Sequence, residues 1–377
     1  MENNSIKRSL KDGCRYPHTE TKKPKAAQVT TTISHPKSSK KIIGLQDLSD
    51  EVIMYIFKYL SHDDLAKMAL LCPNLSRVSH DWSLWKKPRF ENFEKSMEEV
   101  YLSYLKKDTT ELFISCNDVP SHDYSVSENF LIKLKTKCPE LLDLTLKNQV
   151  FDEINVNIFH PKLKTLTIDS STIENVPANT SFLISIDTCP DLERLIITNN
   201  DWFLPQNLYA LSKLERLNYL SLAGCKQFKD CVPYASITTI IGFDFLQTLD
   251  LRFTPVSDRE LVFFQRLPTL KNFLLECPEY MNHEIHSTIT DLGLAELCAA
   301  TLSFRYPYLG VMMGGNGERC CIETFYVRNY PKVTGTFLRI AITHCPHLKL
   351  LDIIGSGCTS AEIEYFKAIR PSTKVIY

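Results

Sequence analysis

Apolar residues recur along residues 105–377 in the pattern Leu-x-x-Leu-x-Leu, with one copy every 22 to 32 residues apart from one gap of 52. In each copy the last two apolar side chains lie on the same side of a short strand, and the residue between them points the other way. Nine copies occur, with central residues Leu112, Leu144, Leu166, Leu195, Leu220, Leu249, Phe273, Phe325 and Leu351. Because one such repeat cannot bury its own apolar face, the pattern predicts a solenoid of stacked repeats.

Stretches with helical spacing separate the predicted strands. Several of them open with an apolar residue, then Ser or Thr, then an acid, and Ser257 and Glu260 have the spacing of a capping box. We expect helices at 128–138, 181–189, 258–267, 291–300, 335–345 and 361–370. The alternation of strands and helices predicts an α/β fold.

A turn position shortly after each strand is often occupied by a small or polar residue that is able to satisfy turn backbone groups. It holds Asn117, Gln149, Ser171, Asn200, Cys225, Thr254 and Ser356. Five cysteines precede proline, which indicates a structural position that is used repeatedly. They are Cys72, Cys138, Cys189, Cys277 and Cys345.

Residues 45–90 have a different, helical pattern. Ser49 precedes two acids and an apolar face, so it is a predicted N-cap, and Ser61 with Asp64 suggests a second helix start. Fewer than about 50 residues rarely supply an adequate core alone. Some of the apolar surface is therefore expected to be buried against a partner or the next domain, although a small helical domain without a partner is an alternative.

The segment resembles an F-box, in which Leu-x-x-Leu-Pro-x-Glu is followed by Ile-Phe-x-x-Leu. The matching residues are Leu45, Leu48, Glu51, Ile56, Phe57 and Leu60, with Ser61, Asp64, Leu65, Leu71, Cys72, Ser83, Leu84 and Trp85 further on. Two positions depart from the family, because Ser49 replaces its proline and Leu75 replaces a frequent tryptophan. The resemblance implies an adaptor-binding surface made of Leu45, Leu48, Ser49, Val52, Ile53, Ile56, Phe57, Leu60, Leu65, Trp82 and Trp85.

The repeats resemble the cysteine-containing leucine-rich repeats that commonly follow an F-box. This resemblance implies an α/β protein with a small all-helical F-box at 42–90 and a curved leucine-rich-repeat solenoid at 91–377, with parallel strands on the concave side and helices on the convex side. About nine repeats are expected, with an irregular or inserted segment near 279–318. The repeated cysteines are then core or turn residues.

The two resemblances together imply the substrate-recognition subunit of an SCF-type (cullin–RING) ubiquitin ligase. A Skp-family adaptor, and through it a cullin scaffold, would bind the F-box, and an unknown substrate protein would bind the repeats. Candidate substrate-binding residues are Arg194, Tyr219, Asp250, Arg252, Glu276, Tyr326, Arg328 and Asp352. Two alternatives stay open, namely a scaffold that does not direct degradation and a hydrolase with its site near Met312-Met313-Gly314-Gly315.

Composition and charge indicate which classes of protein the chain does not resemble and where in the cell it is expected. Residues 1–41 carry ten Lys or Arg against three acids, so we expect a disordered basic tail, in which Lys22-Lys23-Pro24-Lys25 resembles a nuclear-import signal. The chain's net charge is −1, which leaves the remainder at −8 and argues against nucleic-acid binding. No long apolar run or apolar leader occurs, so we expect no membrane span and a cytoplasmic or nuclear protein.

The 13 cysteines are then expected to be reduced. No Cys-x-x-Cys pair occurs in the sequence, so a structural zinc site is not expected. We find no motif for a cofactor or for catalysis, so an enzyme is not expected.

Overall fold

The computed structural model describes residues 44–116, 120–152, 155–175, 182–281, 288–298 and 320–377. The predicted tail at 1–41, Asn117 and the Met-Met-Gly-Gly sequence lie outside these ranges. Much of the irregular segment expected near 279–318 lies outside them as well.

The described chain begins with short helices. They are the 3-10 helix η1 (Leu45–Asp47), α1 (Asp50–Phe57), α2 (His62–Ala69), α3 (Pro73–Ser79) and the 3-10 helix η2 (Trp82–Leu84). The Ser61 hydroxyl accepts a hydrogen bond from the Asp64 amide at 3.1 Å, which confirms the predicted cap of α2. Ser49 is the N-cap residue of α1, but its side chain makes no capping bond. Pro73 occupies the first turn of α3, where its missing N–H costs nothing.

A parallel sheet of eleven strands follows, in the order β1-β2-β3-β5-β7-β8-β9-β10-β11-β12-β13. Its strands are β1 (Arg89–Phe90), β2 (Glu111–Ser115), β3 (Asp143–Lys147), β5 (Thr165–Asp169), β7 (Arg194–Thr198), β8 (Tyr219–Ser221), β9 (Thr248–Asp250), β10 (Asn272–Glu276), β11 (Thr324–Arg328), β12 (Leu350–Asp352) and β13 (Lys374–Ile376). Two short strands, β4 (Val150–Asp152) and β6 (Thr172–Glu174), pair separately. All nine leucine patterns coincide with strands of the large sheet, whereas β1 and β13 were not predicted.

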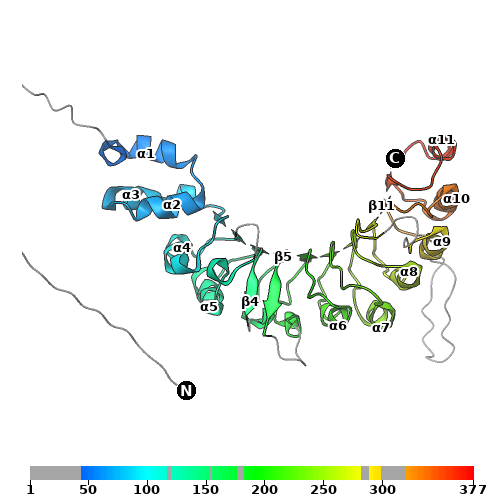
Figure 1. Cartoon of the computed structure of the whole chain (residues 1–377), viewed down its shortest axis with the longest axis horizontal. Coiled ribbons are helices and arrows are strands. Elements are labelled where there is room, and N and C mark those ends of the chain that lie inside the picture. The colour runs from blue at the N-terminus through cyan, green and yellow to red at the C-terminus, as the bar shows by residue number, and fades with distance from the viewer. Residues whose placement is uncertain (1–43, 117–119, 153–154, 176–181, 282–287, 299–319) are drawn as a thin grey trace, which may run out of the picture. The chain divides into compact units, whose positions relative to one another are not determined.

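Helices connect the strands and pack along one side of the strand layer (Figure 1). They are α4 (Glu98–Tyr104), α5 (Glu128–Lys137), α6 (Asn207–Leu211), α7 (Val232–Ile241), α8 (Asp258–Phe264), α9 (Asp291–Cys298), α10 (Gly335–His344) and α11 (Ser360–Ile369). Short 3-10 helices complete the connections at η3 (Lys95–Met97), η4 (His122–Tyr124), η5 (Val156–Ile158) and η6 (Ile186–Thr188). The predicted α/β repeat solenoid with parallel strands is confirmed. The full helix expected at 181–189 was wrong, because only η6 forms in this short connection.

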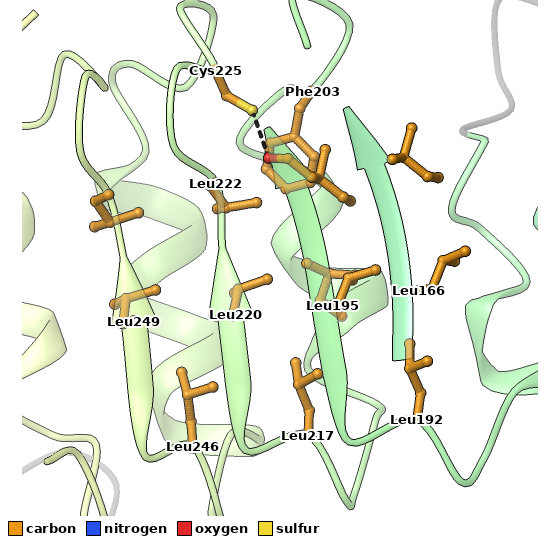
Figure 2. Packing of buried hydrophobic residues seen from close by; sticks show 14 of the residues in the cluster. Leu166, Leu192, Leu195, Phe203, Leu217, Leu220, Leu222, Cys225, Leu246 and Leu249 are labelled. Atoms are coloured by element: carbon orange, nitrogen blue, oxygen red, sulfur yellow. Dashed lines mark hydrogen bonds between the residues drawn. The ribbon is translucent and has the colours of Figure 1, made fainter. Parts of the chain in front are cut away.

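The core lies between the strands and the helices. Leucines at equivalent positions of successive repeats form rows, as Leu195, Leu220 and Leu249 do in Figure 2. These three side chains are at most 3% exposed. Each repeat thus buries its leucines against those of its neighbours, as stacking requires.

The turn after each strand follows a repeated backbone rule. One residue in the turn after the strand has a positive φ in seven repeats, and in six of them it directly precedes the turn position named above. These residues are Asn148, Ser170, Asn199, Gly224, Phe253, Asn329 and Gly355. Glycine and asparagine adopt this left-handed conformation most easily, which explains why they fill five of the seven positions.

The helical segment continues into the sheet without a gap in the core. Trp85 is 1% exposed, its ring stacks 4.0 Å from that of Tyr104, and its indole N–H donates to the Ser79 carbonyl at 2.6 Å. The Asp63 carboxylate accepts hydrogen bonds from the Glu91 and Asn92 amides at 2.7 and 3.2 Å. Since β1 also pairs with β2, the first helices and the sheet share one packed interface.

Candidate functional site

The first helices leave several large apolar side chains open to solvent. Six large side chains, which we call the apolar face, are between 45 and 74% exposed. They are Val52, Tyr55, Tyr59, Leu70, Leu71 and Trp82. Val52 and Tyr55 are three residues apart and so share one side of α1, and Tyr59 follows in the turn after the helix. The Tyr55 and Tyr59 rings lie 5.4 Å apart, edge to face.

The eleven residues predicted to bind an adaptor fall into three groups. Ser49, Val52 and Trp82 are exposed. Leu45, Leu48, Ile56 and Leu60 are half-buried. Ile53, Phe57, Leu65 and Trp85 are at most 2% exposed and hold the helices together. A partner could therefore touch the first two groups directly, while the third group shapes the surface from beneath.

Charged side chains are also present on this segment. The Arg77 guanidinium donates to the Asp50 carboxylate at 2.6 Å and thereby lowers the pKa of that carboxyl. Lys86 lies 6.0 Å from the centre of the Trp82 ring. Exposed apolar side chains together with charged ones are the usual composition of a protein-binding surface.

A second surface is formed by the strand residues that point away from the helices, which we call the strand face. The eight predicted substrate-binding residues all lie on or just after the adjacent strands β7 to β12, so the structure brings them together in one row. Arg194, at the β7 end of this row, is exposed, and its guanidinium lies 3.9 Å from the centre of the Tyr219 ring. At the other end, the Arg328 guanidinium lies 5.2 Å from the centre of the Tyr326 ring.

Two of the predicted acids are buried beneath arginines. Asp250 is 2% exposed and accepts hydrogen bonds from Arg252 Nε at 2.9 Å and Nη2 at 2.8 Å. The Ser221 hydroxyl donates to the same carboxylate at 3.1 Å. This bidentate pair raises the pKa of Arg252 and holds its guanidinium in one orientation.

The second pair joins two neighbouring strands, β11 and β12. Asp352 is fully buried and accepts a hydrogen bond from Arg328 Nη2. Glu276 lies opposite Arg328 in the β10–β11 register. Burial raises the pKa of Glu276, against the opposing effect of Arg328 and Arg252. The strand face from β7 to β12 is therefore a row of mixed charge in which two of the three predicted arginines already have carboxylate partners.

Comparison with known proteins identifies the segment that carries the apolar face. Residues 45–91 match the model of the F-box-like family. The chain therefore carries an F-box-like segment, and this segment is followed by a repeat solenoid. No curated protein sequence matches the chain.

Among solved structures, the chain is similar to an internalin (inlF) from Listeria monocytogenes str. 4b F2365. The identity is 14% and the TM-score 0.43, over 77% of this chain and 71% of that one. It is also similar to the yeast complex of Rad7 and Elc1, with 15% identity and a TM-score of 0.43, over 84% of this chain and 65% of that one.

The structure adds binding candidates that the sequence did not indicate. In the F-box-like segment these are Tyr55, Tyr59, Leu70 and Leu71. The sequence did not indicate them because their residue types are those of core residues, and only their exposure in the structure sets them apart. In the turn beyond β9, the half-buried Phe253 follows Arg252 and has a φ of 59°. This φ belongs to the turn that recurs after the strands, and a large residue in it costs about 1–2 kcal/mol relative to the right-handed region.

In the described residues no helix is long and apolar enough to cross a membrane. The same residues contain one group of three side chains with the spacing of metal ligands, Cys298, Cys320 and Cys345. All three are buried and belong to neither the apolar face nor the strand face.

Proposed function

We propose that this protein is the substrate-recognition subunit of an SCF-type ubiquitin ligase. The F-box-like segment would dock a Skp-family adaptor, which joins it to a cullin scaffold, and the strand face would hold a substrate protein. The observation that carries the proposal is the apolar face, because it lies on the segment that matches the F-box-like family. The protein itself would supply no catalytic group; its contribution would be to raise the effective concentration of substrate near the ubiquitin-charged enzyme.

Energetics favour a partner on the apolar face. Fully burying a large apolar side chain stabilises a complex by about 1.5–3 kcal/mol. Tyr59 and Leu71 are 74 and 67% exposed, so most of this energy is still available at each of them. Several such side chains on one small segment supply the anchors that interfaces typically use.

Binding of a purified Skp-family adaptor to the intact chain tests the first half of the proposal. Val52→Asp and Leu71→Asp place a charge in the proposed interface, and each should weaken the adaptor's Kd at least ~10-fold, which corresponds to about 1.4 kcal/mol. Ile237→Asp is the matched control, since Ile237 is 53% exposed on α7, outside the F-box-like segment, and its replacement should leave the Kd unchanged. A folded intact chain that does not bind the adaptor would overturn the proposal.

The arginine pairs of the strand face suggest what kind of protein binds there. A phosphate group on Arg252 or Arg328 would compete with a carboxylate that is already buried and hydrogen-bonded. If the phosphate drew either arginine away, the buried carboxylate would lose its charged partner, and this loss would cost binding free energy. We therefore propose that the strand face binds an unmodified protein surface of mixed charge.

The cellular levels of proteins that bind the strand face test the second half of the proposal, namely that bound proteins are degraded. Proteins that are captured through the strand face should accumulate when the proteasome is inhibited, and also when Val52→Asp replaces the intact chain. If the adaptor binds but the levels of captured proteins stay constant in both conditions, the protein is instead a scaffold that assembles complexes without directing degradation.

A further inference from the structure

Three cysteines from separate elements meet in the core of the solenoid. Cys298 ends α9, Cys320 lies shortly before β11, and Cys345 follows α10. Their three sulfur atoms all lie within 4.8 Å of one another, and the Sγ atoms of Cys345 and Cys298 are 3.3 Å apart. The three side chains are 1, 5 and 0% exposed, respectively.

Other buried cysteines of the repeats have a different environment. The Cys189 thiol, which follows the same Cys-Pro pattern as Cys345, donates to the His160 carbonyl at 3.6 Å. The Cys225 thiol likewise donates to the Ile197 carbonyl at 3.2 Å (Figure 2). A single thiol bonded to a backbone carbonyl is thus an ordinary way to fill the core here, whereas Cys345 contacts sulfur.

Cys320 also departs from the repeat pattern. It stands four residues before its strand, and in five other repeats this position is proline. The prolines are Pro139, Pro161, Pro190, Pro268 and Pro346. Stacking of repeats therefore does not explain why a third sulfur is placed beside Cys298 and Cys345.

The sulfur positions fit a thiophilic ion. In a tetrahedral zinc site each Zn–S bond is about 2.3 Å long, which places the sulfurs about 3.8 Å from one another. The contact between Cys298 and Cys345 would need to open by about half an ångström to reach this spacing. Thiolate ligands select soft or borderline ions such as Zn²⁺ and Cu⁺ over Mg²⁺ or Ca²⁺.

Charge near the cluster is also favourable. The Arg370 guanidinium donates to the carbonyl oxygen of Cys345. Three thiolates with Zn²⁺ carry a net charge of −1, which this cation partly offsets.

We propose that Cys298, Cys320 and Cys345 bind a thiophilic d10 metal ion of the Zn²⁺ class. The described residues supply three ligands to this cluster, so a water molecule or a small anion would complete a tetrahedral ion. The ion would link the helix before β11 to the helix after it, and so join two neighbouring repeats. This inference is independent of the proposed ligase function.

Zinc protection of the thiols tests the site in the unaltered protein. The reduced full-length chain is alkylated with N-ethylmaleimide with and without Zn²⁺, and the labelled peptides are quantified by mass spectrometry during partial unfolding. Zinc should slow labelling of Cys298, Cys320 and Cys345 by ~10-fold or more while leaving Cys189 unchanged. Equal protection of all four thiols, or no protection of the three, would overturn the proposal.

Variants provide the second measurement. Cys320→Ala should weaken Zn²⁺ binding at least ~10-fold in a chelator competition, because it removes one of three ligands. Cys189→Ser is the matched control, since it changes a buried Cys-Pro cysteine outside the cluster and should bind Zn²⁺ as the unaltered chain does. Equal affinity of Cys320→Ala and the unaltered chain would contradict the site. If Cys320→Ala lacks the circular dichroism of the folded chain, the protection experiment decides alone. A parallel titration with Cu⁺ identifies which ion of the class is preferred.

Discussion

Asn200 is expected to be one of the most sensitive positions in the solenoid. It is fully buried in the turn after β7. Its side-chain N–H groups donate to the carbonyls of Ile168 and Thr198 at 2.8 and 2.7 Å. Its side-chain oxygen accepts from the Ser171 amide at 2.8 Å and from the Trp202 indole at 3.1 Å. One amide thus joins two neighbouring repeats.

Asn200→Ala removes all four hydrogen bonds and adds no new polar partner. Each backbone group that is left buried and unsatisfied costs about 1–3 kcal/mol. The Ile168 carbonyl and the Ser171 amide come from the adjacent repeat, so their loss weakens the interface between repeats as well as the turn. Allowing for partial rehydration, we expect the free energy of unfolding to fall by about 3–5 kcal/mol.

Asn199→Ala is the matched control in the same turn. Asn199 is exposed, has a φ of 56°, and donates to the Asp169 carboxylate at 2.9 Å. Its replacement should cost only about 1 kcal/mol, mainly from backbone strain. Urea unfolding followed by circular dichroism measures both variants, and hydrogen exchange locates the change near β5 and β7. A loss for Asn200→Ala no greater than that for Asn199→Ala would refute the argument that buried amides hold the repeats together.

Three further predictions concern other parts of the chain. Ser49→Pro should raise the free energy of unfolding by about 0.4–1 kcal/mol in thermal unfolding, because Ser49 already has a φ of −69°; a destabilised variant would show that the amide of Ser49 is needed. In urea unfolding, Arg328→Met should destabilise the chain by about 3–5 kcal/mol and Asp352→Asn by about 1–3 kcal/mol, since only the first leaves a fully buried carboxylate unpaired. A larger loss for Asp352→Asn than for Arg328→Met would contradict the burial of the Asp352 carboxylate. Burial raises the pKa of the Cys138 thiol to about 11 and that of Cys225 to about 12, above the ordinary 9.0. Because the unfolded thiols ionise first, stability should fall as pH rises above about 9, by about 1.4 kcal/mol per pH unit for each thiol, and urea titrations of Cys138→Ala should show a shallower fall.

The strands could be predicted because their signal is local and repeated. Leu195, Leu220 and Leu249 each sit in the same short pattern, and the pattern alone determines which side chains face the core. The connections were harder to predict. Helix α7 was missed because it begins at Val232 and continues through a run of apolar and β-branched residues, without a capping signal.

The binding surfaces could be predicted only in part. The resemblance to the F-box family indicated the correct segment, but it did not separate Ile53 and Phe57, which are buried, from Val52, which is exposed. On the strand face, alternation along each strand indicated which residues point outward. Burial of Asp250 beneath Arg252 depends on contacts within and between strands, which no local pattern specifies.

Because the F-box-like segment and the sheet share one core, the number of strands between them sets how far each strand-face residue lies from the segment. Trp85 and Asp63 fix the first helices to β1 and its neighbours, and adjacent strands are about 4.8 Å apart. Measured along the curved sheet, Arg252 beyond β9 then lies six spacings, or about 29 Å, from β1, and Asp352 on β12 lies nine spacings, or about 43 Å, away. Under the proposed function, the number of repeats rather than a hinge would decide which lysines of a bound protein come within reach of the ubiquitin-charged enzyme.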